Sequence, residues 1–201
     1  MKDLLSPKAL LFDMDGVLVD SFDSWWKSLN KALKKEKKQE ITKKAFIDQF
    51  WGDTLQQNLE KLGLDKNNSK FCNTFYDQFI DEVTLFKETK TTLEKLSNYP
   101  KAIITNTPQS CTLKILEKFQ IKKYFNVFVT SDKIEKGKPN PDMVFKACTK
   151  LNVSPKSVIL IGDTENDIKA GRAAGCKTIG INTKADFEIK NIRELLNLIK
   201  I

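Results

Sequence analysis

Two groups of aspartates stand where apolar, strand-like runs end. Asp13 and Asp15 follow the first such run, before a turn that Gly16 permits, and Asp163 and Asp167 follow the fourth. The carboxyl ends of parallel strands meet at one edge of a sheet, where α/β proteins bind ligands. Clustered carboxylates repel one another, and a hard divalent cation with oxygen ligands, such as Mg²⁺, relieves that repulsion.

Hydroxyl, amide and ammonium groups follow the other two runs. Thr105 and Asn106 come just before a helical stretch, whose N-terminal N–H groups and dipole favour an anion. Lys138 precedes a proline that fixes the backbone and could aim the ammonium at a phosphate. Each feature alone also fits a helix cap or a surface turn, as do Asp163 and Thr164. The four together, at one sheet edge, indicate a phosphate site.

Composition narrows the possible chemistry. The 201 residues include no histidine, which excludes Ser-His-Asp and Cys-His catalysis and histidine-ligated metals. Acid and base work therefore falls to carboxylates, lysines or tyrosines. The net charge of +8 favours an anionic partner, but the only arginines are Arg172 and Arg193. With so few planar guanidinium groups, we expect no nucleic-acid partner and assign the charge to attraction of small phosphorylated substrates.

The compartment follows from the cysteines and the hydropathy. Four cysteines are too widely spaced for CxxC pairs and too few for a disulfide scaffold, and we expect reduced, mostly buried thiols at Cys72, Cys111, Cys148 and Cys176. No signal-peptide pattern and no apolar run of 18 residues occurs. We expect a cytoplasmic protein without a membrane partner.

The spacing of strands and helices predicts the fold. Short β-rich runs occur at 9–12, 102–105, 127–130, 157–161 and 178–181. Helical patterns lie between the last four of these runs, and a final helical pattern extends from Ile192 to Ile199. This alternation predicts an α/β protein with a doubly wound parallel sheet. Roughly ninety residues separate the first two runs, too many for a loop. Helical periodicity there predicts an inserted helical unit at 16–85. We expect its core to contain two aromatic stripes, Phe22 with Trp26 on one helix and Phe71, Phe75 and Phe79 on another. We expect the lysine-rich run at 34–38 to form the solvent-exposed end of a helix.

Two motifs carry a family resemblance. The segment DMDGVLVDS at 13–21, combined with KPNP at 138–141, resembles the haloacid-dehalogenase-like hydrolase superfamily. The similar branch includes phosphoglycolate phosphatases and β-phosphoglucomutases, and the resemblance covers essentially the whole chain. It implies a Rossmann-like core at 1–15 and 86–201, with the five runs in spatial order 5-4-1-2-3, and a small α-helical cap at 16–85.

The resemblance also implies roles for the site residues. Asp13 would be the nucleophile that forms an aspartyl-phosphate, and Asp15 the general acid and base. Thr105 and the Asn106 amide would hold phosphoryl oxygens, and Lys138 would offset negative charge. Mg²⁺ would be bound by the following groups: Asp13, the backbone carbonyl of Asp15, Asp163 and, perhaps through water, Asp167. The related dehalogenases lack the second carboxylate, so Asp15 favours a phosphate ester.

The cap would select the substrate. Trp51 and Gly52 resemble the cap segment that faces the core in this branch, with Gly52 leaving room near the leaving group. A helix cap at Asp53 explains the same residues equally well.

The expected function is a Mg²⁺-dependent phosphatase that hydrolyses a small phosphorylated metabolite, phosphoglycolate-like or a sugar phosphate. One alternative is a phosphosugar mutase of the β-phosphoglucomutase type, which excludes water so that the sugar is rephosphorylated. The second alternative is an inactive nucleic-acid-binding protein, against which the four retained motifs argue. We expect a monomer or a homodimer.

Overall fold

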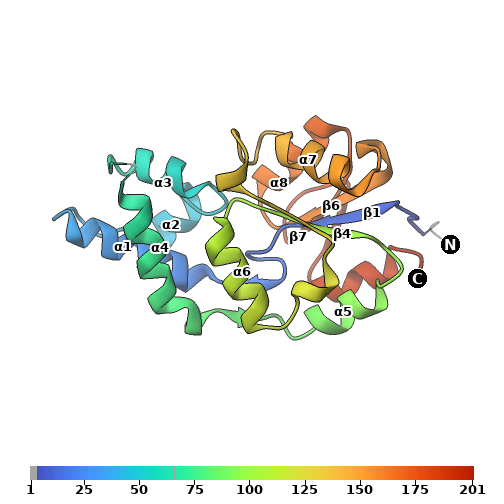
Figure 1. Cartoon of the computed structure of the whole chain (residues 1–201), viewed down its shortest axis with the longest axis horizontal. Coiled ribbons are helices and arrows are strands. Elements are labelled where there is room, and N and C mark those ends of the chain that lie inside the picture. Colours follow the sequence, from blue (N-terminus) through green and yellow to red (C-terminus); the bar gives the residue numbers. More distant parts are fainter. Residues whose placement is uncertain (1–3, 66) are drawn as a thin grey trace.

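A parallel sheet forms the centre of the larger part of the molecule (Figure 1). The computed structural model describes residues 4–65 and 67–201, and the side chains of all of these except Ser69, Phe71 and Phe75. In spatial order the strands are β5 (Val127–Thr130), β4 (Lys101–Thr105), β1 (Ala9–Phe12), β6 (Val158–Gly162), β7 (Lys177–Ile181) and β8 (Phe187–Ile189).

The predicted strand order is confirmed, with one strand added. The five predicted runs are β1, β4, β5, β6 and β7, and their spatial order corresponds to 5-4-1-2-3. The additional strand β8 pairs with β7 at the edge of the sheet. Its three residues run from half-buried Phe187 through exposed Glu188 to buried Ile189. A run this short has too few apolar residues to be found by hydropathy.

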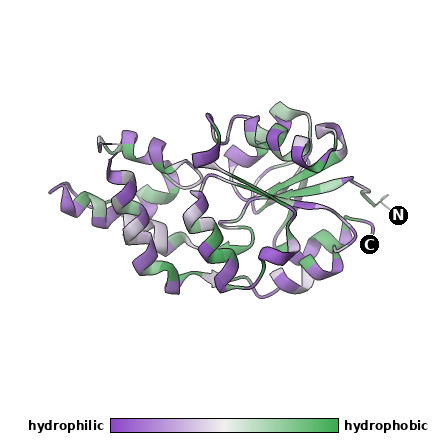
Figure 2. Ribbon diagram, in the orientation of Figure 1, coloured by the Kyte–Doolittle hydropathy of each residue, from purple (hydrophilic) through white to green (hydrophobic). Residues whose placement is uncertain are grey.

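The strands are buried on both faces because helices cover both. In β1, Leu10 and Phe12 belong to one apolar cluster, while Ala9 and Leu11 belong to the other, as the period of two in a strand requires. Figure 1 shows α7 and α8 on one side of the sheet and α5 and α6 on the other, and Figure 2 shows the strands between them as hydrophobic. These helices are α5 (Thr89–Lys95), α6 (Gln109–Lys118), α7 (Asp142–Leu151) and α8 (Glu165–Ala174).

The predicted insertion contains the other helices, α1 (Phe22–Lys35), α2 (Lys43–Gln49), α3 (Leu55–Lys61) and α4 (Asn68–Phe79). A short antiparallel pair, β2 (Val19–Asp20) with β3 (Thr84–Leu85), lies at its two ends. Both connections between insertion and core therefore run side by side. We propose 16–85 as the cap and 1–15 with 86–201 as the core, and the β2–β3 pair supports that division.

Aromatic residues pack inside the insertion. The Trp25 and Tyr76 rings lie 4.1 Å apart between α1 and α4, and Phe22 contacts the rings of Phe46 and Trp51. In α1 the buried tryptophan is Trp25, while the predicted Trp26 is only partly buried and packs against that core. The predicted core positions Phe71 and Phe75 lie outside the described side chains.

The closing helix is shorter than predicted. The chain forms a 3₁₀ helix, η5 (Ile192–Asn197), and Ile199 lies in a β-bridge with Leu5 instead of a helix. Other 3₁₀ turns are η1 (Ile80–Glu82), η2 (Lys122–Tyr124), η3 (Ser131–Lys133) and η4 (Pro155–Ser157). The side chains at 34–38 are exposed at the end of α1, as predicted.

All four cysteines are buried free thiols, as predicted. Burial raises the pKa of Cys72, Cys111 and Cys176 to about 12 and that of Cys148 to about 11, which favours the unreactive thiol form. None of the helices in the described part of the chain has the length and hydropathy of a membrane span.

Candidate active site

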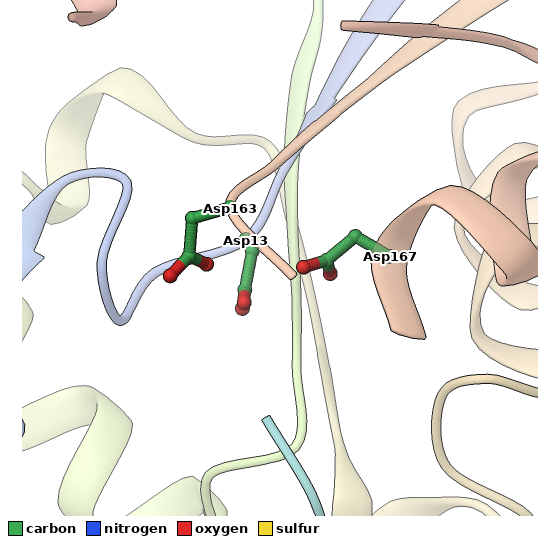
Figure 3. Close-up of side chains that lie close together, drawn as sticks. All are labelled: Asp13, Asp163 and Asp167. Atoms are coloured by element: carbon green, nitrogen blue, oxygen red, sulfur yellow. The ribbon is translucent and has the colours of Figure 1, made fainter. Parts of the chain in front are cut away.

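Three carboxylates converge at the carboxyl end of the sheet. Asp13 directly follows β1, Asp163 directly follows β6, and Asp167 lies in the first turn of α8. Because β1 and β6 are hydrogen-bonded neighbours, their ends bring the first two side chains together. One oxygen of each of the three carboxylates lies within 4.8 Å of the others, and Figure 3 shows the side chains facing a common space.

Lys138 is the cation of this cluster. Its Nζ lies 2.9 Å from Asp13 Oδ1 and 2.6 Å from Asp167 Oδ1, and the residue is only 1% exposed. Asn106 holds the lysine backbone, since its Nδ2 donates to the Lys138 carbonyl at 2.9 Å and its Oδ1 accepts from the Lys138 N–H at 3.0 Å. A side chain from the end of β4 therefore positions the lysine that contacts the carboxylates.

The electrostatics of the cluster are unbalanced. Burial raises the pKa of Asp13 well above its ordinary value, and Lys138 opposes that shift. Burial and the charge of Asp167 raise the pKa of Asp163 to about 7. Burial lowers the pKa of Lys138, but the charges of Asp13 and Asp167 outweigh it, so the net shift is upward. Three carboxylates around one ammonium leave excess negative charge, which a further cation would offset.

Asp163 has an oxygen available for such a cation. Its Oδ1 is buried and has no hydrogen-bond partner, while its Oδ2 accepts from Trp51 Nε1 at 3.1 Å. Gly16 keeps this space open: its φ is +75°, and a Cβ there would lie 2.1 Å from Asp163 Oδ2. Oxygen donors, an unpaired buried carboxylate oxygen and this glycine fit a small, hard cation such as Mg²⁺.

Asp15 is held by hydroxyl groups rather than by the lysine. Thr107 Oγ1 donates to Asp15 Oδ2 at 2.7 Å, Thr105 Oγ1 donates to the same oxygen at 3.3 Å, and Ser21 Oγ donates to Asp15 Oδ1. The sequence interpretation did not assign roles to Ser21 and Thr107. Both residues stand next to predicted site residues in the sequence: Ser21 ends the first motif, and Thr107 lies two positions after Thr105.

The side chains of Asn106 and Asp167 are already engaged by the protein. Asn106 Nδ2 also donates to the Gly52 carbonyl at 2.8 Å. Asp167 Oδ2 accepts from the Thr164 N–H at 3.1 Å and from Thr164 Oγ1 at 2.6 Å, and its Oδ1 contacts Lys138. Thr164 is also the N-cap residue of α8. The same segment can therefore cap the helix and contribute carboxylates to the site. These contacts favour positioning roles for both side chains.

The insertion closes over these groups and leaves a cavity of about 40 Å³. Trp51 lines it, as predicted. The predicted room at Gly52 is used differently: a Cβ there would lie 2.9 Å from Thr164 Cγ2, so the glycine permits contact with the core. The alternative helix cap at Asp53 is wrong, because Thr54 caps α3 with a reciprocal Thr54–Gln57 capping box.

The comparisons with known proteins agree with this geometry. The model of the haloacid dehalogenase-like hydrolase family matches residues 10–181. A phosphoglycolate phosphatase of Aquifex aeolicus (strain VF5) is 28% identical over 205 residues, which cover 95% of this chain and 96% of that protein.

Two solved structures share the fold. CbbY from Rhodobacter sphaeroides, in complex with phosphate, has a TM-score of 0.84 at 18% identity and covers 94% of this chain and 96% of its own. The β-phosphoglucomutase of Clostridium difficile has a TM-score of 0.83 at 22% identity and covers 94% and 93%. With a family match over most of its length and the same fold around the converging aspartates, the chain belongs to the haloacid dehalogenase-like hydrolase family.

Proposed function

We propose that the protein is a Mg²⁺-dependent phosphatase that hydrolyses a small phosphorylated metabolite through an aspartyl-phosphate. The observation that carries this proposal is the convergence of Asp13, Asp163 and Asp167 with Lys138 beside a cavity that the insertion covers in part. The similarity to a phosphoglycolate phosphatase supports the reaction class.

In the first step, a carboxylate oxygen of Asp13 attacks phosphorus, and the bond from phosphorus to the leaving oxygen breaks. Asp15 gives its proton to that oxygen, so the leaving group departs as a neutral alcohol. Hydrogen bonds from Ser21 and Thr107 hold the Asp15 carboxyl in a fixed orientation for this transfer.

In the second step, water attacks the phosphorus of the aspartyl-phosphate while Asp15 takes a proton from it. The bond between phosphorus and Asp13 breaks, which releases inorganic phosphate and restores the Asp13 carboxylate. The protein has no histidine, and Asp15 lines the cavity where the water would stand, so we assign this proton transfer to Asp15.

Lys138 and the metal would compensate charge in both steps. We assign Asp13, the carbonyl of Asp15 and Asp163 as the metal ligands, with Asp167 close by. When bound, Mg²⁺ supplies positive charge next to the phosphoryl oxygens. Lys138 offsets the charge on Asp13, while the Thr105 hydroxyl and the backbone amide of Asn106 would bind phosphoryl oxygens.

Two substitutions test this function on p-nitrophenyl phosphate, with and without Mg²⁺. Asp13→Asn keeps the shape but removes the nucleophile, and we expect turnover to fall by at least about a thousandfold. Asp15→Asn is expected to impair release of the leaving group in the same way. Undiminished turnover by folded Asp13→Asn protein would contradict the mechanism.

The phosphosugar mutase remains the alternative reaction at the same site. It retains the aspartyl-phosphate but returns the phosphoryl group to sugar. Time-resolved ³¹P NMR distinguishes the two, since isomerised hexose phosphate without stoichiometric inorganic phosphate would favour the mutase.

A further inference from the structure

The wall of the cavity opposite the aspartates is apolar and aromatic. The residues from the insertion that form it are Trp25, Leu29, Phe46, Phe50, Trp51, Gly52, Asp53, Leu55 and Asn58. The phosphoryl group must lie near Asp13, so the leaving group faces this wall. The properties of the wall therefore determine which leaving groups the enclosed site accepts.

Among the described residues that line the cavity, none is a lysine or an arginine, and the charged ones are all aspartates. Lys138 lies beneath Asp13 and is occupied by two carboxylates. Lys61 of the insertion contacts the lining residue Asp53, with its Nζ 2.5 Å from Asp53 Oδ2 and 2.6 Å from the Gln49 carbonyl, and its side chain is about half exposed. Among the described residues that line the cavity, a second anionic group on the substrate would therefore find no cation.

Such a group would be costly to enclose. A carboxylate or second phosphate would lose its hydration against aromatic rings, and it would face the negative charges of the site without a partner. A neutral leaving group avoids both penalties.

One polar group of the wall is unsatisfied. Asn58 lines the cavity and is 6% exposed, and its buried Oδ1 has no hydrogen-bond partner. An unpaired buried acceptor is unfavourable until a donor reaches it. A hydroxyl group on the leaving group is a donor that could satisfy Asn58 Oδ1, for which the described residues supply no donor.

We infer, on the basis of the proposed phosphatase activity, that the substrate is a phosphomonoester of a small, uncharged alcohol, whose second hydroxyl donates to Asn58 Oδ1. Phosphoglycolate, pyrophosphate and sugar bisphosphates are disfavoured because each carries a second anionic group. For this chain the inference therefore argues against the substrate given in the name of the Aquifex relative.

A matched pair of substrates tests the charge. 2-Hydroxyethyl phosphate and 2-phosphoglycolate have the same length. The first ends in a neutral CH₂OH group and the second ends in a carboxylate. We expect kcat/KM to be at least tenfold higher for the neutral ester in wild-type protein with Mg²⁺. Equal values, or a preference for 2-phosphoglycolate, would overturn the inference.

A second comparison tests Asn58. Ethyl phosphate lacks the terminal hydroxyl, so wild-type protein should prefer 2-hydroxyethyl phosphate over it, and Asn58→Leu should abolish that preference. Gln56→Leu, an exposed residue of the same helix, is the matched control and should retain it. If Asn58→Leu keeps the wild-type preference, Asn58 is not the acceptor.

Binding separates this inference from the phosphatase proposal. Calorimetry with the Asp13→Asn variant and Mg²⁺ compares the same two esters without turnover. Tighter binding of 2-hydroxyethyl phosphate would support the preference for an uncharged leaving group. If the wild-type protein then hydrolysed neither ester, that result would contradict only the phosphatase proposal. Tighter binding of 2-phosphoglycolate, or binding of neither ester, contradicts the inference.

Discussion

At the scale of single residues, the site is organised by buried charges whose partners come from distant parts of the chain. Lys138 contacts Asp13 and Asp167, and each of these three side chains is nearly inaccessible to solvent. Removing one member of a buried ion cluster leaves the others uncompensated, which costs more than an exposed pair contributes. We therefore expect Lys138 to stabilise the fold in addition to the catalytic role proposed for it.

Lys138→Met is expected to lower the free energy of unfolding by about 3 kcal/mol and turnover by at least about a hundredfold. Adding Asp167→Asn removes one of the two stranded carboxylates, so it should restore part of the stability without restoring activity. Urea denaturation and the p-nitrophenyl phosphate assay measure the two effects. Lys133→Met, on a largely exposed lysine nearby in the sequence, is the control and should change neither. Wild-type stability in Lys138→Met would show that the buried cluster does not depend on its cation.

At the scale of elements, short caps and loops hold the insertion against the core. Trp51 Nε1 donates to Asp163 Oδ2, and Asn106 and Asn166 both donate to the Gly52 carbonyl. These contacts come from the segment just before α3. The Thr54–Gln57 capping box defines where α3 begins, and therefore where that segment ends.

Thr54→Ala removes the acceptor for the Gln57 N–H and is expected to cost about 1 kcal/mol in the free energy of unfolding. Thr54→Ser keeps the hydroxyl and should retain most of that stability. Gln56→Ala lies on the same helix outside the capping box and is the control. Denaturation by urea measures all three, and equal losses in Thr54→Ala and Gln56→Ala would rule out the capping effect.

At the scale of the whole molecule, a lysine-rich protein encloses an acidic site. The net charge is +8, yet three carboxylates meet around one lysine at the sheet edge. The overall charge favours the approach of anions, while the local excess of carboxylates favours a divalent cation. The folded state should therefore bind Mg²⁺ at a place that the unfolded chain lacks.

Mg²⁺ at millimolar concentration is expected to raise the melting temperature by about 5 °C, because a ligand that binds only the folded state stabilises it. EDTA should reverse the shift. Differential scanning fluorimetry measures it, and Asp163→Asn, which removes the carboxylate with the unpaired oxygen, should reduce it. A shift of the same size in that variant would place the metal elsewhere.

The sequence alone determined which polar residues follow the buried strands of the core. Buried strands in parallel sheets appear as short apolar runs, and the residues that follow them must meet at one edge. For this reason the sequence predicted that Asp13, Asp15, Lys138 and Asp163 lie at one sheet edge, and the resemblance implied the strand order; the catalytic roles of these residues stay predictions. The short edge strand β8 escaped notice because three residues carry no periodic signal.

Only the tertiary structure decided what each side chain contacts. Periodicity indicates which face of a helix is buried but not against what. It therefore could not show that Trp51 reaches Asp163, or that Asn106 holds Lys138. The unpaired Asn58 and the absence of a lining cation among the described residues follow from how the insertion closes on the core. Hydrogen bonds and charge balance depend on distances between segments far apart in the chain, and local sequence patterns do not encode those distances.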